Sequence, residues 1–286
     1  MSFVHCDNLV KIYKVADLEV VALQGVDLEI DKGEMMAIVG ASGSGKSSLL
    51  NILGGLDKPS AGKIRVGNYD LTRLKKREQV AYRRKSVGFV WQQTARNLIP
   101  YLTAKQNVEL PMALNRLNKR EREARAVELL NSVGLGDRLN HLPRNLSGGQ
   151  QQRVAIAIAM ANFPDLLLAD EPTGQVDSEA ANTIFDAMLQ LNQHYGVTVV
   201  IVTHDYTVSD RVERVITMRD GHMMNEFIRD NNSDLDPTEY ALVDRGGRLQ
   251  LPQEYLDKLS IADRVRLQLH ADYVAVYPAS KRESNE

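Results

Sequence analysis

The segment Met35-Met36-Ala37-Ile38-Val39-Gly40-Ala41-Ser42-Gly43-Ser44-Gly45-Lys46-Ser47 decides the fold of this 286-residue chain. Its apolar first part is typical of a strand buried on both faces, and the rest fits the phosphate-binding loop pattern Gly-x4-Gly-Lys-Ser/Thr. Glycines let backbone amides close around phosphates, and residues 47–53 are predicted to begin a helix whose free amides face the loop. Strand, loop and helix together predict a phosphate site on an α/β core.

The wider pattern of apolar residues indicates the same fold class, an α/β phosphate-loop nucleoside-triphosphatase core. Apolar and polar positions alternate over residues 1–30, which predicts an antiparallel β subdomain. Strand signals vanish between residues 103 and 162, so a helical subdomain is expected at about 93–162. Helical stretches separate the remaining apolar segments, which favours a largely parallel sheet. Those segments are expected to be buried strands at residues 87–91, 165–169 and 197–202.

The chain changes character after residue 229. A polar cluster predicts a linker over residues 230–240. Beyond it, alternating apolar residues around a Gly246-Gly247 turn predict a small β-rich domain at 241–280, with a short helix at 253–258 and strands at 265–269 and 273–277. Residues 281–286 are expected to be a disordered tail. The phosphate site therefore belongs to a first domain of residues 1–229.

Composition excludes several classes of protein. A formal net charge of −2 gives no reason to expect nucleic acid as the main partner. No apolar run approaches the roughly 18 residues of a membrane span, and the N-terminus lacks the pattern of a signal peptide. The single cysteine, Cys6, excludes an internal disulfide and is interpreted as structural. A soluble protein inside the cell is expected.

Charged and polar side chains follow the predicted strands at the edge where ligands of open α/β sheets collect. Lys46 is expected to reach the β- and γ-phosphates of a nucleotide, and Ser47 to ligate magnesium together with Asp170. Glu171 is interpreted as a general base for the attacking water, the alternative being a second structural acid. His204 follows the last buried strand and is interpreted as a functional residue, the alternative being an ordinary structural histidine.

With Leu146-Ser147-Gly148-Gly149-Gln150 between the phosphate loop and Asp170-Glu171, the chain resembles the nucleotide-binding domain of ATP-binding cassette (ABC) transporters over about residues 1–229. The resemblance implies a homodimer in which two domains associate head to tail around two ATP molecules, each ATP capped by the partner's pentapeptide. Half of each ATPase site would then be borrowed from the second copy. The resemblance further implies ATP hydrolysis that drives separate transmembrane permease subunits, and hence a peripheral location on the inner face of the cell membrane.

The resemblance also assigns roles residue by residue. Tyr13 is expected to stack on adenine, with ordinary strand packing as the alternative, and Gln92 to touch the magnesium ion. Asp177 is expected in a loop that crosses the dimer interface, and His204 to contact the γ-phosphate. The remaining residues expected to hold Mg-ATP are Ser42, Gly43, Ser44, Gly45, Lys46, Ser47, Ser48, Ser147, Gly148, Gly149 and Gln150.

Within the family, the chain is most similar to the macrolide-export, lipoprotein-release and cell-division class. The residues that carry this likeness are segments 51–57, 107–111 and 169–174. Trp91, the longer segment at 94–96 and Gln175-Val176 depart from the class pattern. The segment after Gln92 contacts the membrane subunit in this family, so the departure at 94–96 implies an altered partner.

The last domain, residues 241–280, resembles the swapped-hairpin fold of AbrB-type transition regulators, although it lacks the usual glycine before Asp263. DNA binding and homodimerisation are the two functions such a module suggests. Its five basic residues are matched by five acidic ones, which gives no excess positive charge for phosphates and favours dimerisation. The rival functions for the whole chain are a soluble ABC ATPase of DNA repair or translation and a nucleotide-gated DNA regulator.

Overall fold

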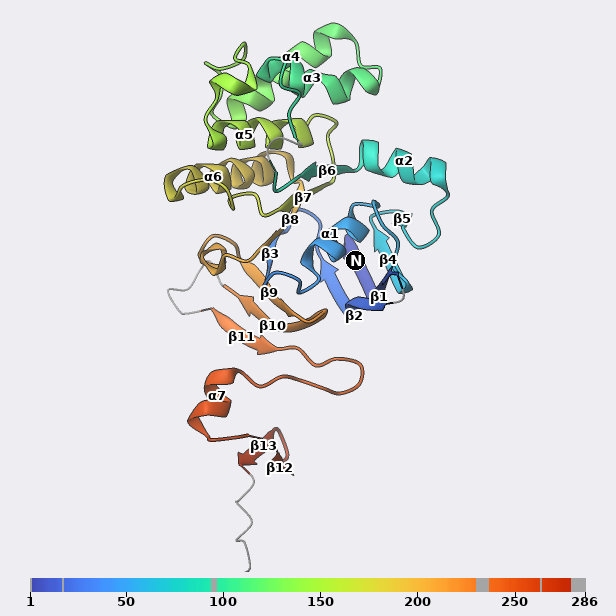
Figure 1. The fold of residues 1–286 in the computed structure, drawn as a ribbon, viewed down its shortest axis with the longest axis vertical. Helices are drawn as coiled ribbons and strands as arrows, with labels where there is room; N and C mark the ends of the chain where they lie inside the picture. Colours follow the sequence, from blue (N-terminus) through green and yellow to red (C-terminus); the bar gives the residue numbers. More distant parts are fainter. Residues whose placement is uncertain (1, 17, 94–96, 230–236, 263, 279–286) are drawn as a thin grey trace, which may run out of the picture. The chain divides into compact units, whose positions relative to one another are not determined.

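The computed structural model describes residues 2–16, 18–93, 97–229, 237–262 and 264–278. The chain divides into two compact units, Met1–Tyr240 and Ala241–Glu286. The first unit contains two sheets and a group of helices, and the second contains a two-stranded sheet and one helix (Figure 1). The predicted fold class, an α/β core with an antiparallel β subdomain, a helical subdomain and a small β-rich C-terminal part, is confirmed.

A seven-stranded sheet forms the centre of the first unit. Its strands run in the order β11-β10-β9-β3-β8-β7-β6. Strands β9, β3, β8, β7 and β6 are parallel to one another, whereas β10 is antiparallel to β9. Parallel strands end at one edge of a sheet, so the loops after β3, β7 and β8 lie together. The strands are β3 (Met35–Val39), β6 (Val87–Val90), β7 (Leu166–Asp170), β8 (Thr198–Thr203), β9 (Arg214–Arg219), β10 (His222–Ile228) and β11 (Thr238–Ala241).

The middle strands are buried, as their apolar sequences predict. Every residue of β3 and β8 is buried, which is the pattern of parallel strands covered on both faces. Helices α5 (Gly148–Ala159) and α6 (Ser178–Tyr195) supply the apolar residues that pack against them in one continuous core. Helices α1 (Lys46–Leu53) and α2 (Lys76–Lys85) contact the sheet through β8, β7 and β6.

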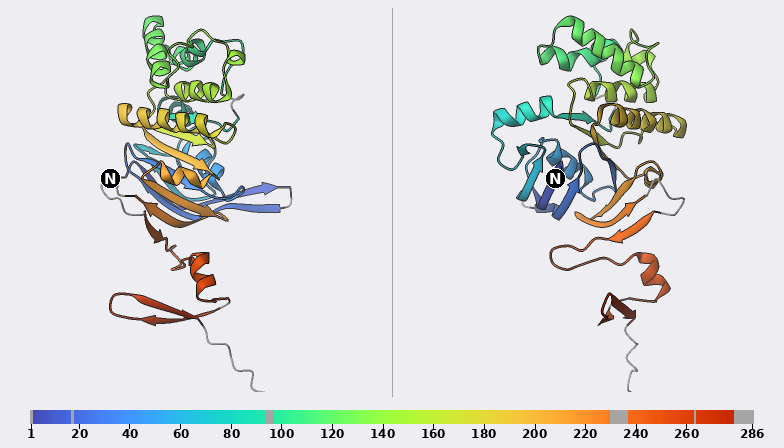
Figure 2. Two further views of the ribbon diagram at one scale, coloured as in Figure 1. Left: turned by 90° about the vertical axis from the view of Figure 1, so that its left-hand side faces the viewer. Right: turned by 180° about the vertical axis from the view of Figure 1, so that it is seen from behind.

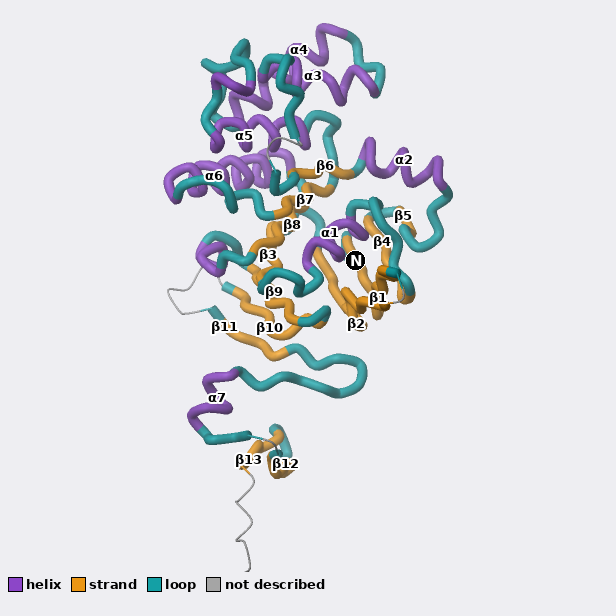
Figure 3. Tube along the Cα trace, viewed as in Figure 1, coloured by secondary structure: helices purple, strands orange, loops and turns teal. Residues whose placement is uncertain are grey.

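A second, antiparallel sheet has the strand order β2-β1-β4-β5. Its long hairpin of β1 (Val4–Val15) and β2 (Leu18–Ile30) matches the alternating pattern at the N-terminus and is drawn in orange in Figure 3. The shorter strands are β4 (Ala61–Val66) and β5 (Tyr69–Asp70). This sheet brings the outer end of β2 beside the phosphate loop.

The expected helical subdomain consists of α3 (Ala104–Leu114), α4 (Lys119–Ser132), the 3-10 turn η2 (Pro143–Asn145) and α5. Helices α3 and α4 pack on each other and on α5, which in turn packs on α6. Figure 2 shows this helical group at one end of the first unit, in green. Helix α5 therefore links the helical group to the central sheet. None of the described helices is long and apolar enough to cross a membrane.

The expected boundaries differ from the observed ones in a systematic way. Strands β7 and β8 each extend one residue beyond the apolar run, because Asp170 still pairs with Val202 and Thr203 with Val39. Strands β9 and β10 were not predicted from the sequence, and β11 lies in the expected linker. Their mixed apolar and polar residues lack the continuous pattern of the buried strands. Residues 230–236 of that linker lie outside the described residues.

The second unit contains helix α7 (Gln253–Lys258) and a hairpin of β12 (Val265–Leu269) and β13 (Val274–Pro278). A turn at Gly246 and Gly247, in which Gly247 N donates to Asp244 O at 2.9 Å, precedes the helix. The helix and the hairpin lie where the sequence places them. The tail expected at 281–286 lies outside the described residues.

Candidate functional site

The loop between β3 and α1 packs so tightly that two of its glycines admit no side chain. A Cβ atom on Gly40 would lie 2.1 Å from Met218 O of β9, and one on Gly45 would lie 2.4 Å from Ala22 O of β2. Gly45 also has a φ of 105°, a left-handed conformation that favours glycine. These contacts fix the loop against both sheets and leave the first turn of α1 open to the cleft.

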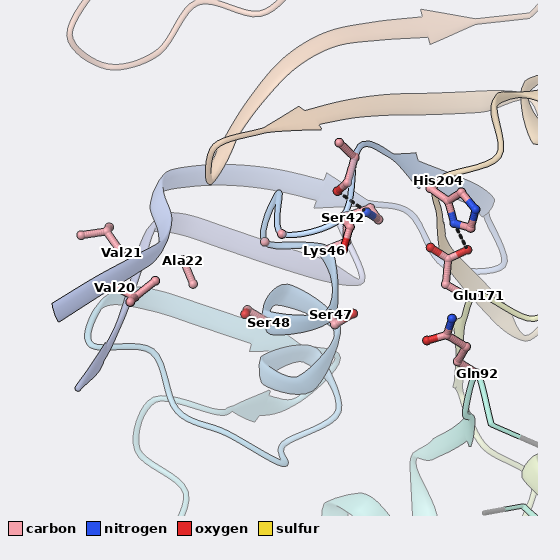
Figure 4. Close-up of a pocket in the computed structure, with 13 residues that line it drawn as sticks. Val20, Val21, Ala22, Ser42, Lys46, Ser47, Ser48, Gln92, Glu171 and His204 are labelled. Carbon is pink, nitrogen blue, oxygen red and sulfur yellow. Dashed lines mark hydrogen bonds and ion pairs between the residues drawn. The ribbon is translucent and has the colours of Figure 1, made fainter. Parts of the chain in front are cut away.

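A cleft of about 570 Å³ lies over this loop (Figure 4). It extends from the beginning of β2 across the phosphate loop to the residues that follow β6, β7 and β8, so five separate segments of the chain build it. Figure 4 places Gln92, Glu171 and His204 on one side of it, away from Val20 and Val21. The lining residues are Val20, Val21, Ala22, Ala41, Ser42, Gly43, Gly45, Lys46, Ser47, Ser48, Gln92, Glu171 and His204.

Lys46 folds back onto its own loop. Its Nζ atom donates to Gly40 O at 2.6 Å and to Ala41 O at 2.9 Å, and the side chain is buried. Burial lowers the pKa of the Lys46 ammonium, and the nearby carboxylates of Glu171 and Asp170 oppose that change. The ammonium is therefore held by neutral carbonyl groups within reach of the cleft, and an anion there offers it a stronger partner.

Asp170 ends β7 beside the first turn of α1. The Ser47 hydroxyl donates to Asp170 Oδ1 at 3.2 Å. Burial raises the pKa of Asp170, the Ser47 hydrogen bond opposes this, and the charge of Glu171 adds to it. The Ser47 hydroxyl and the Gln92 amide line the cleft, whereas Asp170 is not among the lining residues and is linked to the cleft by its hydrogen bond with Ser47. Oxygen donors of these kinds are the ligands that magnesium prefers. The donor set fits a magnesium ion.

Glu171 is held in place by two neighbours. The Thr203 hydroxyl donates to Glu171 Oε2 at 2.9 Å, and His204 Nδ1 lies 2.9 Å from the same oxygen. Glu171 adopts a φ of 48°, which is uncommon outside glycine, and its amide donates to Val202 O at 2.8 Å. The Glu171 side chain is 11% exposed and that of His204 is 62% exposed. The carboxylate is thus fixed while the imidazole faces solvent.

Thr203 is a residue of the site that was not predicted from the sequence. Its side chain is buried at the end of β8, and its hydroxyl accepts from Asp205 N at 3.1 Å while it donates to Glu171. The sequence feature that could have identified Thr203 is a polar residue directly after the apolar segment 197–202. That residue was interpreted only as the end of the strand. Ala22 and Ala41 also line the cleft without having been predicted.

Tyr13 is not among the residues that line this cleft. Its hydroxyl donates to Asp57 Oδ2 at 3.0 Å, and the Lys11 ammonium lies 4.7 Å from the centre of its ring. Tyr13 pairs with Val20 across the β1–β2 hairpin, and Val20 does line the cleft. The expected adenine contact of Tyr13 stays a prediction.

The segment Leu146–Gln150 also lies outside the cleft lining. Ser147 caps the N-terminus of α5, where its Oγ accepts from Gln150 N at 3.3 Å and Gln150 Oε1 accepts from Ser147 N at 2.9 Å. Asp177 caps α6 in a similar way by accepting from Ala180 N at 2.8 Å. A Cβ atom on Gly149 would lie 2.8 Å from Ala180 Cβ, so the two helix starts are adjacent. These groups face solvent rather than the chain's own phosphate loop.

Comparisons with known proteins identify the class. The family model described as "ABC transporter" matches residues 23–174. The chain is 45% identical over 216 residues to the lipoprotein-releasing system ATP-binding protein LolD 2 of Caulobacter vibrioides, covering 76% of this chain and 94% of that one. It is 44% identical over 221 residues to the uncharacterized ABC transporter ATP-binding protein YknY of Bacillus subtilis, covering 77% and 95%.

Among solved structures, the dimeric post-hydrolysis state of the ATP-binding cassette MJ0796 bound to ADP and Pi is similar, with a TM-score of 0.72. The two are 44% identical, over 79% of this chain and 99% of that one. This chain therefore belongs to the ABC transporter family. It is an ATP-binding cassette of the ATP-hydrolysing kind.

Proposed function

We propose that two copies of this chain close head to tail around two Mg-ATP molecules and that this closure drives separate permease subunits in a membrane. The observation that carries the proposal is the split site. The cleft contains the phosphate loop, Glu171 and His204 but no residue of segment 146–150, which caps α5 on an exposed surface. In the dimer, segment 146–150 of a second copy completes the site over the first copy's phosphate loop.

In the closed dimer, the partner's α5 start meets the γ-phosphate of the bound ATP. The helix N-terminus offers backbone amides and a favourable dipole to an anion, and the Ser147 hydroxyl adds a donor. The amides of α1 and the Lys46 ammonium hold the phosphates from the other side. Tyr13 and the exposed Val20 contact the adenine end, and Asp177 contacts the partner beside its phosphate loop. Closure is thus linked to the presence of a γ-phosphate.

Hydrolysis follows from the arrangement of Glu171. A water aligned with the γ-phosphorus gives its proton to the Glu171 carboxylate, the bond between the water oxygen and phosphorus forms, and the bond from phosphorus to the bridging oxygen breaks to leave ADP and phosphate. Thr203 and His204 hold one carboxylate oxygen and leave the other free to accept the proton. His204 is exposed enough to turn towards the γ-phosphate.

Ser47, Asp170 and Gln92 would hold the magnesium ion. When bound, the ion neutralises charge on the β- and γ-phosphate oxygens. The buried position of Asp170 favours a neutral carboxyl without a cation, so the cation and the carboxylate stabilise each other. The Ser47 hydroxyl already points at that carboxylate.

The permease contact is proposed at the helical subdomain and the segment after Gln92, which places the chain on the cytoplasmic side of a membrane. Helix α3 contains segment 107–111, one of the segments in which the chain is similar to the macrolide-export and lipoprotein-release class. The helical subdomain projects from the central sheet (Figure 2). Residues 94–96, where the chain departs from its class, lie outside the described residues.

The test of the proposal is Glu171→Gln. The amide keeps the size and the hydrogen-bond acceptor for Thr203 but takes no proton, so turnover is expected to fall by about a hundredfold to ten-thousandfold. ATP should still bind, and because hydrolysis is stalled, ATP with magnesium should convert the protein into a more compact closed state, measured by small-angle X-ray scattering. Near-normal turnover would refute the role of Glu171, and scattering that does not change with ATP would refute closure around the nucleotide.

A further inference from the structure

The C-terminal unit has no core of its own. No apolar side chain is buried among its described residues, whereas the first unit buries a continuous cluster. Leu267 is 65% exposed and Leu269 is 81% exposed, although both lie in a paired strand. Large apolar side chains in regular structure are normally covered. Something outside the unit is therefore expected to cover them.

Leu267 and Leu269 lie on the same face of the β12–β13 hairpin. Paired residues of antiparallel strands point to the same face, so the register assigns each pair to a side. The opposite face carries Arg266 and Gln268 against Tyr277 and Ala275, with the Arg266 guanidinium 4.9 Å from the centre of the Tyr277 ring. The other side, here named the apolar hairpin face, consists of Val265, Leu267, Leu269, Val274, Val276 and Pro278.

A unit this small needs an additional source of stability. An isolated two-stranded hairpin is marginal in water, and chains near 40 residues usually depend on disulfides, metals or association. The sequence has a single cysteine, which excludes an internal disulfide. No group of three metal-ligating side chains occurs within the part of the chain that the structure describes. Association with another surface is therefore the remaining source of stability for this unit.

The charges of the unit narrow the choice of partner. Arg248 Nε lies 2.8 Å from Asp244 Oδ2, and Lys258 pairs with Glu254 one helical turn away. These basic groups are thus paired locally with acids of the same unit. A surface that binds nucleic acid or an anionic membrane presents an excess of basic side chains beside its contact face. The apolar hairpin face itself carries no charge.

We infer that the apolar hairpin face packs against the same face of a second copy of this chain and keeps two cassettes together when no nucleotide is bound. A second copy is present wherever the cassette forms its dimer, and a face of purely apolar residues is complementary to itself. The attachment then raises the effective concentration of one cassette for the other between rounds of hydrolysis. That second role, but not the contact itself, rests on the proposed head-to-tail ATPase.

Two neighbouring substitutions in the full chain test the contact. Leu267→Asp places a charge in the centre of the apolar hairpin face, and Gln268→Asp places the same charge on the opposite face of the same strand. Sedimentation velocity without nucleotide and with a chelator is expected to show dimers for wild type and Gln268→Asp. Leu267→Asp should raise the dimer dissociation constant by at least about a hundredfold. A monomeric wild type, or equal effects of the two variants, contradicts the inference.

Cross-linking gives a positive signal that does not depend on disrupting the hairpin. Cys6 is buried, and burial raises the pKa of its thiol, so it stays unreactive. Oxidation of Leu267→Cys without nucleotide is expected to give a covalent dimer, and oxidation of Gln268→Cys is not. Equal yields at both positions, or none at Leu267→Cys, overturn the inference.

The same variants separate this contact from the ATPase dimer. Leu267→Asp combined with Glu171→Gln is expected to be monomeric without ATP and dimeric with Mg-ATP. If this double variant stays monomeric with Mg-ATP while the wild type is dimeric without nucleotide, the proposed function is refuted and the hairpin contact is not. Flotation of the wild-type chain with vesicles of anionic and neutral lipids identifies the competing occupant, because binding that Leu267→Asp abolishes would assign the apolar hairpin face to a membrane instead.

Discussion

Helices α1 and α5 both begin at segments that can bind phosphate, but they begin differently. Helix α1 starts at Gly45, which has no side chain to cap it, and its first turn opens into the cleft. Helix α5 starts at Ser147, whose hydroxyl and the Gln150 side chain cap its free amides on an exposed surface. The start of α1 is open to the nucleotide that its own chain binds. The start of α5 is stabilised by its cap until it meets the nucleotide bound to the partner.

The largest effect expected from this difference is at Ser147. Aspartate caps a helix as well as serine does, so Ser147→Asp should leave stability almost unchanged while it places a negative charge against the partner's γ-phosphate. Turnover is expected to fall by about a hundredfold with ATP binding to the single chain preserved, as measured by equilibrium nucleotide binding and phosphate release.

Thr103 offers the matched control for that substitution. It caps α3 through the same capping box, with its Oγ accepting from Gln106 N at 3.2 Å. Thr103→Asp should leave turnover close to that of the wild type. If both substitutions lower turnover equally, the start of α5 has no special role in ATP hydrolysis.

A smaller effect is expected on the α1 side of the site, at Thr203. Valine has the shape of threonine but lacks the hydroxyl that orients Glu171 and accepts from Asp205 N. Thr203→Val should lower kcat by about tenfold while KM for ATP changes little, because the carboxylate loses its orientation and the nucleotide keeps its contacts. Thr203→Ser should restore most of kcat. A loss confined to KM would show that Thr203 supports binding only.

The smallest effect concerns stability at Asp170. Burial raises its pKa in the folded chain, so the folded state holds this proton more tightly than the unfolded state, and stability decreases as pH rises through the range of that pKa. Asp170→Asn removes the buried charge and keeps an acceptor for Ser47. In nucleotide-free protein with a chelator, the thermal midpoint of the variant should exceed that of wild type by more at pH 7 than at pH 4.

Asp177→Asn is the control for that measurement, because Asp177 is exposed and asparagine still caps α6. Its midpoint difference from wild type should not show the same rise with pH. A constant difference for Asp170→Asn across the pH range would mean that its buried charge does not weaken the folded state.

The sequence was sufficient for those features that depend on short patterns. Continuous apolar runs identified β3, β7 and β8, and the glycine loop identified the start of α1. Helix α7 and the β12–β13 hairpin followed from turn residues and alternation. Local patterns work here because burial on both faces and phosphate binding each demand particular residues at fixed spacing.

Features that depend on contacts between distant segments could not be predicted. Strands β9 and β10 have mixed sequences, yet Met218 O of β9 is what leaves no room for a side chain at Gly40. The hydrogen bond from Thr203 to Glu171 joins residues 32 positions apart, and no local sequence pattern predicts it. The pentapeptide 146–150 identified the family and, through the resemblance, a site shared between two copies, whereas its nearness to the start of α6, where Gly149 adjoins Ala180, required the structure.

Mixing two inactive variants tests the shared site most directly. Lys46→Ala spoils the phosphate loop and leaves the α5 start intact, whereas Ser147→Arg blocks the α5 start and leaves the loop intact. In a head-to-tail dimer that contains one of each, one site has both halves spoiled and the other has both intact. After the two variants have been incubated together until their subunits have exchanged, an equal mixture should recover about a quarter of wild-type ATP hydrolysis, since half of the dimers are mixed and each mixed dimer has one complete site. A mixture no more active than its two components would contradict a shared site.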